Sequence, residues 1–221
     1  EFIELSAAAL QERAEAAVEA FERQVAHGGL VSTEARVVGA EPLDAVVQAS
    51  RCCDLLIVGQ TDRAGNVAGV AWDFPRHAVL QGGVPVLVVP FAGTFAHAAE
   101  CVLVAWKDTR EAARALHDAL PLLEAANRVV LLAIDETPTL PDRSTQDDLH
   151  AWLHRHGIDA DVHRDPVPAD VGEALLSRAS DIGADLIVMG AYGHSRLREW
   201  ALGGATRHLL DHMTLPTLMS H

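Results

Sequence analysis

The chain has 221 residues and a formal net charge of −14, which is enough length for one large or two small domains. The acidic balance argues against a nucleic-acid partner, because binding to a phosphate backbone needs clustered Lys and Arg. No apolar run approaches the ~20 residues of a membrane-spanning helix, and no signal peptide is evident. The three cysteines form no disulfide framework, so we expect a reducing, cytoplasmic location and no membrane partner.

Helices and strands alternate in the first part of the chain. A long amphipathic helix is predicted over residues 5–24, where apolar residues recur at helical spacing. A strand over 33–38, a helix over 43–51, a strand over 55–58, a helix over 75–81 and a strand over 86–89 are predicted to follow.

The second part has the same alternation and is more complete. Strands are predicted over 101–106, 129–134, 160–163, 185–189 and 217–219, and helices over 109–123, 147–156, 170–182 and 204–212. Continuous apolar runs such as 101–106 are typical of strands that a parallel sheet buries on both faces. This order predicts an α/β fold with a doubly wound, five-stranded parallel sheet and right-handed crossovers.

An internal repeat relates the two parts. Segment 54–59 (DLLIVG) matches segment 185–190 (DLIVMG), and the offset is 185 − 54 = 131 residues. Arg76-His77 recurs as Arg207-His208, and Pro85 recurs as Pro216, at the same offset. Three matches at one offset without a gap predict two homologous domains, residues 1–92 and 98–221, joined near 91–99.

The first domain lacks counterparts of the first two strands and the first helix of the second domain. A parallel sheet without its central strands leaves buried backbone groups unpaired, which is costly. We therefore expect that the natural protein has roughly a few dozen residues before Glu1, since a domain needs the rest of its core.

A glycine-rich segment follows the strand over 185–189 and is the candidate binding motif. Glycine permits positive φ and close approach of a ligand to the backbone. The N-terminus of the next helix offers free N–H groups and a partial positive charge, which suit a phosphate. Thr206 can add a hydroxyl donor, as can Ser195. The segment contains Gly190, Gly193, Gly203, Gly204, Ala205 and Thr206.

The spacing Gly-x2-Gly-x9-Gly, the segment ADLIVMGAYGHSRLREWALGGATRHLL and the closing Pro-Thr-Leu-Met together resemble the universal stress protein family. The resemblance covers the second domain and most of the first. It implies an adenine-nucleotide site, ATP-like and with or without Mg²⁺, in the second domain. Its triphosphate would lie over Gly190, Gly193, Gly203 and Thr206, with adenine and ribose near Ala105, Trp106 and Ile134. His194, Gly204 and Ala205 complete the expected contacts.

Two residues depart from the family pattern. Gly204 stands where the family often has Ser or Thr, so one phosphate donor is lost. Lys107 stands where the family often has an Asp that contacts the nucleotide. Lys107 can pair with a phosphate instead or be simply solvated, and Asp108 can take the acidic role.

The corresponding loop of the first domain is predicted not to bind ATP. At the offset of 131, Gly193 corresponds to Asp62, Gly203 to Trp72, Gly204 to Asp73 and Thr206 to Pro75. Two carboxylates and a bulky ring would thus stand where phosphate binds, and proline lacks an N–H donor.

Neither a metal site nor a catalytic group is predicted. His150 and His154 have the i, i+4 spacing of zinc ligands, but no Cys accompanies them and a solvated helix face explains them. No residue is clearly placed as a general base, so any ATPase activity should be slow.

Our first hypothesis is therefore a nucleotide-binding protein with a regulatory, stress-protective role. One alternative is a nucleotide-free dimerising scaffold of the same fold, and another is a site for a different adenylate-containing ligand. In the family, last strands pair between domains. We therefore expect strands 86–89 and 217–219 to pair with each other in a pseudo-two-fold unit, with a homodimer possible through other faces.

Overall fold

The computed structural model describes residues 2–29, 32–61, 73–135, 143–166, 170–193 and 204–221. It divides into two compact units, Glu1–Glu41 and Pro42–His221. The first unit contains helix α1 (Phe2–Gly28). The strand predicted over 33–38 is wrong, because residues 33–39 are irregular. No described strand pairs with this segment, and its Glu34 and Arg36 are exposed and pair with each other. An unpaired strand is not stable in water.

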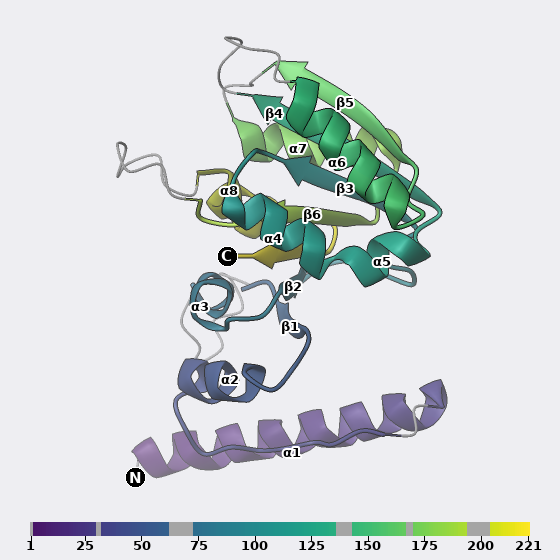
Figure 1. Cartoon of the computed structure of the whole chain (residues 1–221). Coiled ribbons are helices and arrows are strands. Elements are labelled where there is room, and N and C mark those ends of the chain that lie inside the picture. Colours follow the sequence, from purple (N-terminus) through teal and green to yellow (C-terminus); the bar gives the residue numbers. More distant parts are fainter. Residues whose placement is uncertain (1, 30–31, 62–72, 136–142, 167–169, 194–203) are drawn as a thin grey trace. The chain divides into compact units, whose positions relative to one another are not determined.

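The second unit alternates helices and strands (Figure 1). Most bounds agree with the sequence-based prediction within a few residues. The helix predicted over 109–123 is instead two helices, because Pro121 lies in the first turn of the second one and lacks the N–H that would continue the first. The elements are α2 (Pro42–Ser50), β1 (Leu56–Gly59), α3 (Phe74–Gln81), β2 (Val86–Val89), β3 (Cys101–Trp106), α4 (Arg110–Asp118), α5 (Leu120–Ala125), β4 (Arg128–Asp135), α6 (Arg143–Arg155), β5 (Ala160–Pro166), α7 (Val171–Ile182), β6 (Leu186–Gly190), α8 (Gly204–His212) and β7 (Thr217–Ser220).

The described strands form one seven-stranded sheet in the order β1-β2-β7-β6-β3-β4-β5. The strands from β7 to β5 are parallel, as are β1 and β2, whereas β2 and β7 are antiparallel. The α/β class and the doubly wound parallel sheet of the second half are therefore confirmed. The predicted pairing of the two last strands is also present, so the strands of the two halves join in a single sheet.

Helices cover both faces of this sheet. Helices α4, α5 and α6 pack on one face around Val104, Leu131 and Val188. Helices α3, α7 and α8 pack on the other face around Leu103, Leu132 and Ile187. Adjacent strand residues thus enter different cores, which explains why the strands are apolar at nearly every position.

The 131-residue offset of the sequence recurs in the strand register. The pairs Leu56↔Val86 to Gly59↔Val89 in β1–β2 become Ile187↔Thr217 to Gly190↔Ser220 in β6–β7 when 131 is added to each number. The antiparallel pairing of β2 with β7 is symmetric about Leu87↔Leu218, since 87 + 131 = 218. The offset is therefore preserved in the backbone pairing as well as in the sequence.

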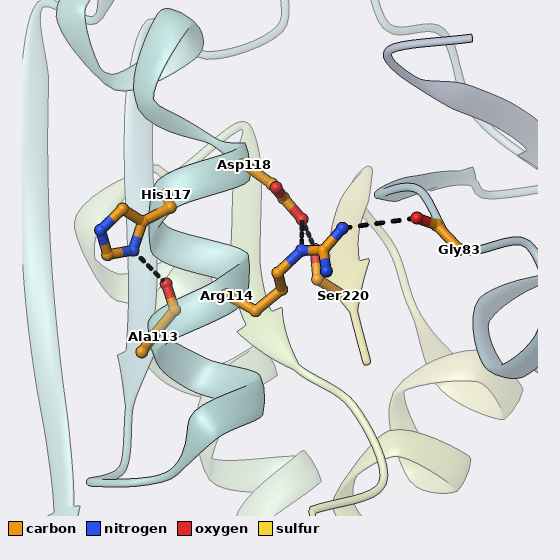
Figure 2. Close-up of polar contacts among 6 residues, drawn as sticks. All are labelled: Gly83, Ala113, Arg114, His117, Asp118 and Ser220. Atoms are coloured by element: carbon orange, nitrogen blue, oxygen red, sulfur yellow. Dashed lines mark hydrogen bonds and ion pairs between the residues drawn. The ribbon is translucent and has the colours of Figure 1, made fainter. Parts of the chain in front are cut away.

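A polar cluster reinforces the contact between β7, α4 and the turn before β2 (Figure 2). The Arg114 guanidinium pairs with Asp118 at 3.0 Å and also donates to the Gly83 carbonyl at 3.4 Å. The buried Ser220 hydroxyl donates to the same Asp118 carboxylate at 2.8 Å. Asp118 thereby links the last strand of the second half to a helix that contacts the first half.

We predict that Leu218→Lys and Val88→Lys each destabilise the protein by at least about 3 kcal/mol, because each places an unpaired ammonium in a core. Leu218 and Val88 are 1% and 0% exposed and lie in different cores. Urea unfolding would measure the loss. The matched control is Ile57→Lys in β1, where the side chain is 61% exposed. A comparable loss in that control would contradict the assignment of Leu218 and Val88 to buried cores.

Candidate functional site

The candidate site lies where β3 and β6 end. The chain passes from β3 to β4 and β5 on one side, then crosses to β6 and β7 on the other side of β3. Ala105 pairs with Met189 and Trp106 with Ala133, so the segments after β3, β4 and β6 emerge at one edge. Such a reversal of strand order at carboxyl ends is where open α/β sheets bind ligands.

The segment after β3 turns directly into α4. Trp106 is buried and Ala105 is partly buried, whereas Lys107 and Asp108 are exposed at the edge. Thr109 caps α4, because its Oγ1 accepts from the Ala112 N–H at 3.3 Å. A cation and an acid are therefore both available to solvent at the first residues beyond β3.

Gly190 is required by packing. A Cβ at this position would lie 2.4 Å from the Ala112 nitrogen and 2.5 Å from the Glu111 carbonyl carbon, both of the α4 backbone. A Cβ at its counterpart at the 131-residue offset, Gly59, would meet no atom of the described residues within 4 Å. Gly190 therefore lets α4 approach β6 closely, a role that the sequence-based prediction of a phosphate contact did not include.

Gly193 lies against a buried carboxylate. A Cβ there would be 3.1 Å from Glu111 Oε2 and 3.9 Å from Thr109 Oγ1. Glu111 is only 4% exposed, and its Oε1 accepts from Arg110 at 3.1 Å. Glu111 was not among the residues predicted from the sequence, although helical spacing places it with Ala112, Ala115 and Leu116 on the buried face of α4.

The start of α8 holds the other described residues of the motif. Gly204 is exposed and a Cβ there would meet none of the described residues within 4 Å, so no packing demand among them explains the absence of Ser or Thr. Ala205 is partly buried, and Thr206 is 3% exposed. His194, Ser195 and Gly203 lie outside the described residues. Ile134 is described in its backbone, which pairs with Asp165 in β5.

Tyr192 anchors the loop after β6. Its φ of 55° is in the left-handed region, which is uncommon for residues other than glycine. The Arg76 guanidinium of α3 lies 5.5 Å from the ring centroid, a cation–π geometry. The hydroxyl is buried and has no hydrogen-bond partner within the part of the chain that the structure describes. Burial, with Asp211 and Asp73 nearby, raises the pKa of Tyr192 to about 12, although Arg76 opposes this shift.

The corresponding region of the first half has a different chemistry. Asp73, the counterpart of Gly204, pairs with His77 at 3.1 Å. Pro75, the counterpart of Thr206, is buried in the first turn of α3. Asp62 and Trp72 lie outside the described residues. The start of α3 thus carries a carboxylate and lacks one N–H donor.

Two further kinds of feature are absent from the described residues. They contain no cluster of three or more His, Cys, Asp or Glu side chains that could hold a metal ion. None of their helices is long and apolar enough to cross a membrane.

The fold and the glycine segment define a doubly wound α/β protein with a candidate site at the reversal of strand order. A family model for the universal stress protein family matches residues 100–221, more than half of the chain. The chain therefore belongs to the universal stress protein family. A search of curated proteins found no match.

Solved structures support the fold. A universal stress protein from Archaeoglobus fulgidus DSM 4304 has a TM-score of 0.73 at 18% identity, covering 95% of this chain and 78% of its own. A functionally unknown protein from Pseudomonas aeruginosa PAO1 has a TM-score of 0.57 at 18% identity, with coverages of 93% and 77%. An Arabidopsis thaliana family protein with AMP bound has a TM-score of 0.36 at 13% identity, with coverages of 54% and 89%, a likeness too low to indicate a ligand here.

We predict that Gly190→Ala destabilises the protein by about 1–3 kcal/mol, because the added methyl overlaps the α4 backbone. Gly59→Ala should change the free energy of unfolding by less than about 1 kcal/mol, since no described residue lies within 4 Å of the added methyl. Paired urea titrations would measure both variants. Equal effects of the two substitutions would refute the packing role of Gly190.

Tyr192 is the only tyrosine in the chain, so its ionisation can be followed directly by ultraviolet absorbance. We expect a pKa near 12 in the native protein and near 10 in urea. Burial favours the neutral phenol, so the phenol ionises at a lower pH in the unfolded chain than in the folded protein. The corresponding part of the free energy of unfolding is therefore present below pH 10 and is lost as the pH rises towards 12. Tyr192→Phe should remove that part of the pH dependence, and a native titration near 10 would show that the hydroxyl is solvated.

Proposed function

We propose that the second half binds an adenine nucleotide, ATP-like, at the carboxyl ends of β3 and β6. The observation that carries the proposal is the position of the glycine segment, which leaves β6 at the reversal of strand order and leads into the N-terminus of α8. The exposed Lys107 and Asp108 and the partly buried Ala105 lie at the same edge. Family membership adds to this reading, because the resemblance of the motif implies such a site.

We also propose that the chain is a tandem of two family domains, 1–92 and 98–221. The identical register of β1–β2 and β6–β7 at an offset of 131 residues supports it. So does the symmetry of the β2–β7 pair about Leu87 and Leu218. On this reading, the strand pairing replaces an association between two separate domains, and a further homodimer would use other faces.

The first half is proposed not to bind nucleotide. Asp73 and Pro75 stand where the second half has Gly204 and Thr206, so the start of α3 offers negative charge and one donor fewer. We infer a regulatory role in a stress response, with at most slow hydrolysis. The buried carboxylate at the site, Glu111, is already paired with Arg110 rather than placed as a free base.

A nucleotide-free scaffold is the second candidate, and two observations favour it. Gly190 has a sufficient reason in packing against α4, and Gly193 faces the Glu111 carboxylate, which repels phosphate. Under this alternative the glycines would be retained for folding, and the strand pairing of the two halves would be the main feature of the protein.

The test is the melting temperature with and without ATP and Mg²⁺, because a ligand that binds only the folded state stabilises it by mass action. We expect a rise for the natural sequence and none for Gly193→Asp, which adds charge and bulk beside Glu111. Gly39→Asp is the control for added charge, since a Cβ there would meet no atom within 4 Å. If ATP does not change the melting temperature of the natural protein, the scaffold is favoured. If ATP raises the melting temperature of Gly193→Asp as much as that of the natural protein, the nucleotide binds elsewhere.

A further inference from the structure

Glu111 is a buried acid at the edge where the nucleotide is proposed to bind. Its side chain is 5% exposed, whereas that of its partner Arg110 is 72% exposed. Burying a carboxylate is costly unless charges or donors compensate for it. Arg110 and the N-terminal end of α4 supply part of that compensation.

The carboxylate lies at the glycine loop. Glu111 Oε1 accepts from Arg110, and Oε2 comes within 3.1 Å of the ideal Cβ position of Gly193. The carbonyl carbon of Glu111 lies 2.5 Å from the ideal Cβ position of Gly190. Glu111 therefore borders both described glycines of the loop after β6.

A phosphate bound on the side of Gly193 that faces Glu111 would lie close to this carboxylate. Two negative charges at such a separation repel each other. A divalent cation removes the repulsion, since Mg²⁺ is commonly held by one or two carboxylates together with substrate phosphates and several waters. One acidic side chain is enough in such a site.

We propose that Glu111 makes the loop selective for nucleotide phosphates that carry a divalent cation, by repelling the free polyphosphate and contributing an oxygen ligand to the cation. This inference rests on the proposed nucleotide site and assigns to Glu111 a specificity role within it. The cation enters with the nucleotide and is held by phosphate and Glu111 oxygens together.

The experiment is calorimetric titration of the full chain with ATP, once with Mg²⁺ and once with EDTA. The natural protein should bind at least about tenfold more tightly with Mg²⁺. In Glu111→Gln that ratio should fall to below about threefold, chiefly because affinity in EDTA rises as the repelling charge is removed. The control is Glu173→Gln, which removes an exposed acid from the first turn of α7; it should keep the natural ratio.

A second variant, Glu111→Asp, tests the inference if Glu111→Gln does not fold. Glu111→Asp keeps the charge but shortens the side chain, so the ratio should lie between those of the natural protein and Glu111→Gln. An unchanged ratio in a folded Glu111 variant that binds ATP would overturn the inference and leave the nucleotide site standing. A natural protein that binds ATP equally with Mg²⁺ and EDTA would do the same. No ATP binding under either condition would overturn the proposed function and this inference together.

Discussion

The antiparallel pairing of β2 with β7 is the interaction on which the second unit depends. Among the described strands, β1 and β2 would otherwise form a two-stranded piece, which is too small to be stable alone. With it, Val86, Val88 and Met219 enter a shared core, and helices from both halves, α3 and α8, pack on the same face. The pairing also covers what would otherwise be an exposed apolar edge on the last strand of each half.

The site follows from the parallel part of the same sheet. Because β3 lies between β6 and β4, the segment that starts α4 must pass the end of β6. Gly190 allows this approach, and the first turn of α4 then brings Glu111 to Gly193. The close packing of α4 on β6 therefore also places the Glu111 carboxylate beside the glycine loop.

Much of the fold could be predicted from the sequence because buried parallel strands are uninterrupted apolar runs, and β2, β3 and α8 have the predicted bounds. The repeat offset predicted which strands correspond, and the family resemblance predicted that the last ones pair. The segment over 33–38 has strand-forming residues but no described partner strand, and a single sequence does not contain that information. The packing role of Gly190 was missed because glycine spacing resembles a ligand motif whether a helix or a phosphate approaches the backbone. Glu111 was missed because its position beside Gly193 depends on how α4 packs on β6. Of the proposed contacts, the residues at 105–108, 190 and 193 do gather at one edge, while the loop chemistry beyond them stays a prediction.

The same repeated residue can have different contacts in the two halves, because these contacts depend on the strand that lies beside it. Asp185 accepts hydrogen bonds from the backbone N–H groups of Glu100 and Cys101, both at 2.9 Å, and so joins the start of β6 to that of β3. Asp54 occupies the matching position before β1, but among the described residues β1 pairs with β2 alone and has no strand in the place of β3. A second strand for this aspartate to join is therefore described in the second half only. The proposed asymmetry of the two loops therefore rests on their residues, since Asp73 and Pro75 stand at the start of α3 where Gly204 and Thr206 stand at the start of α8.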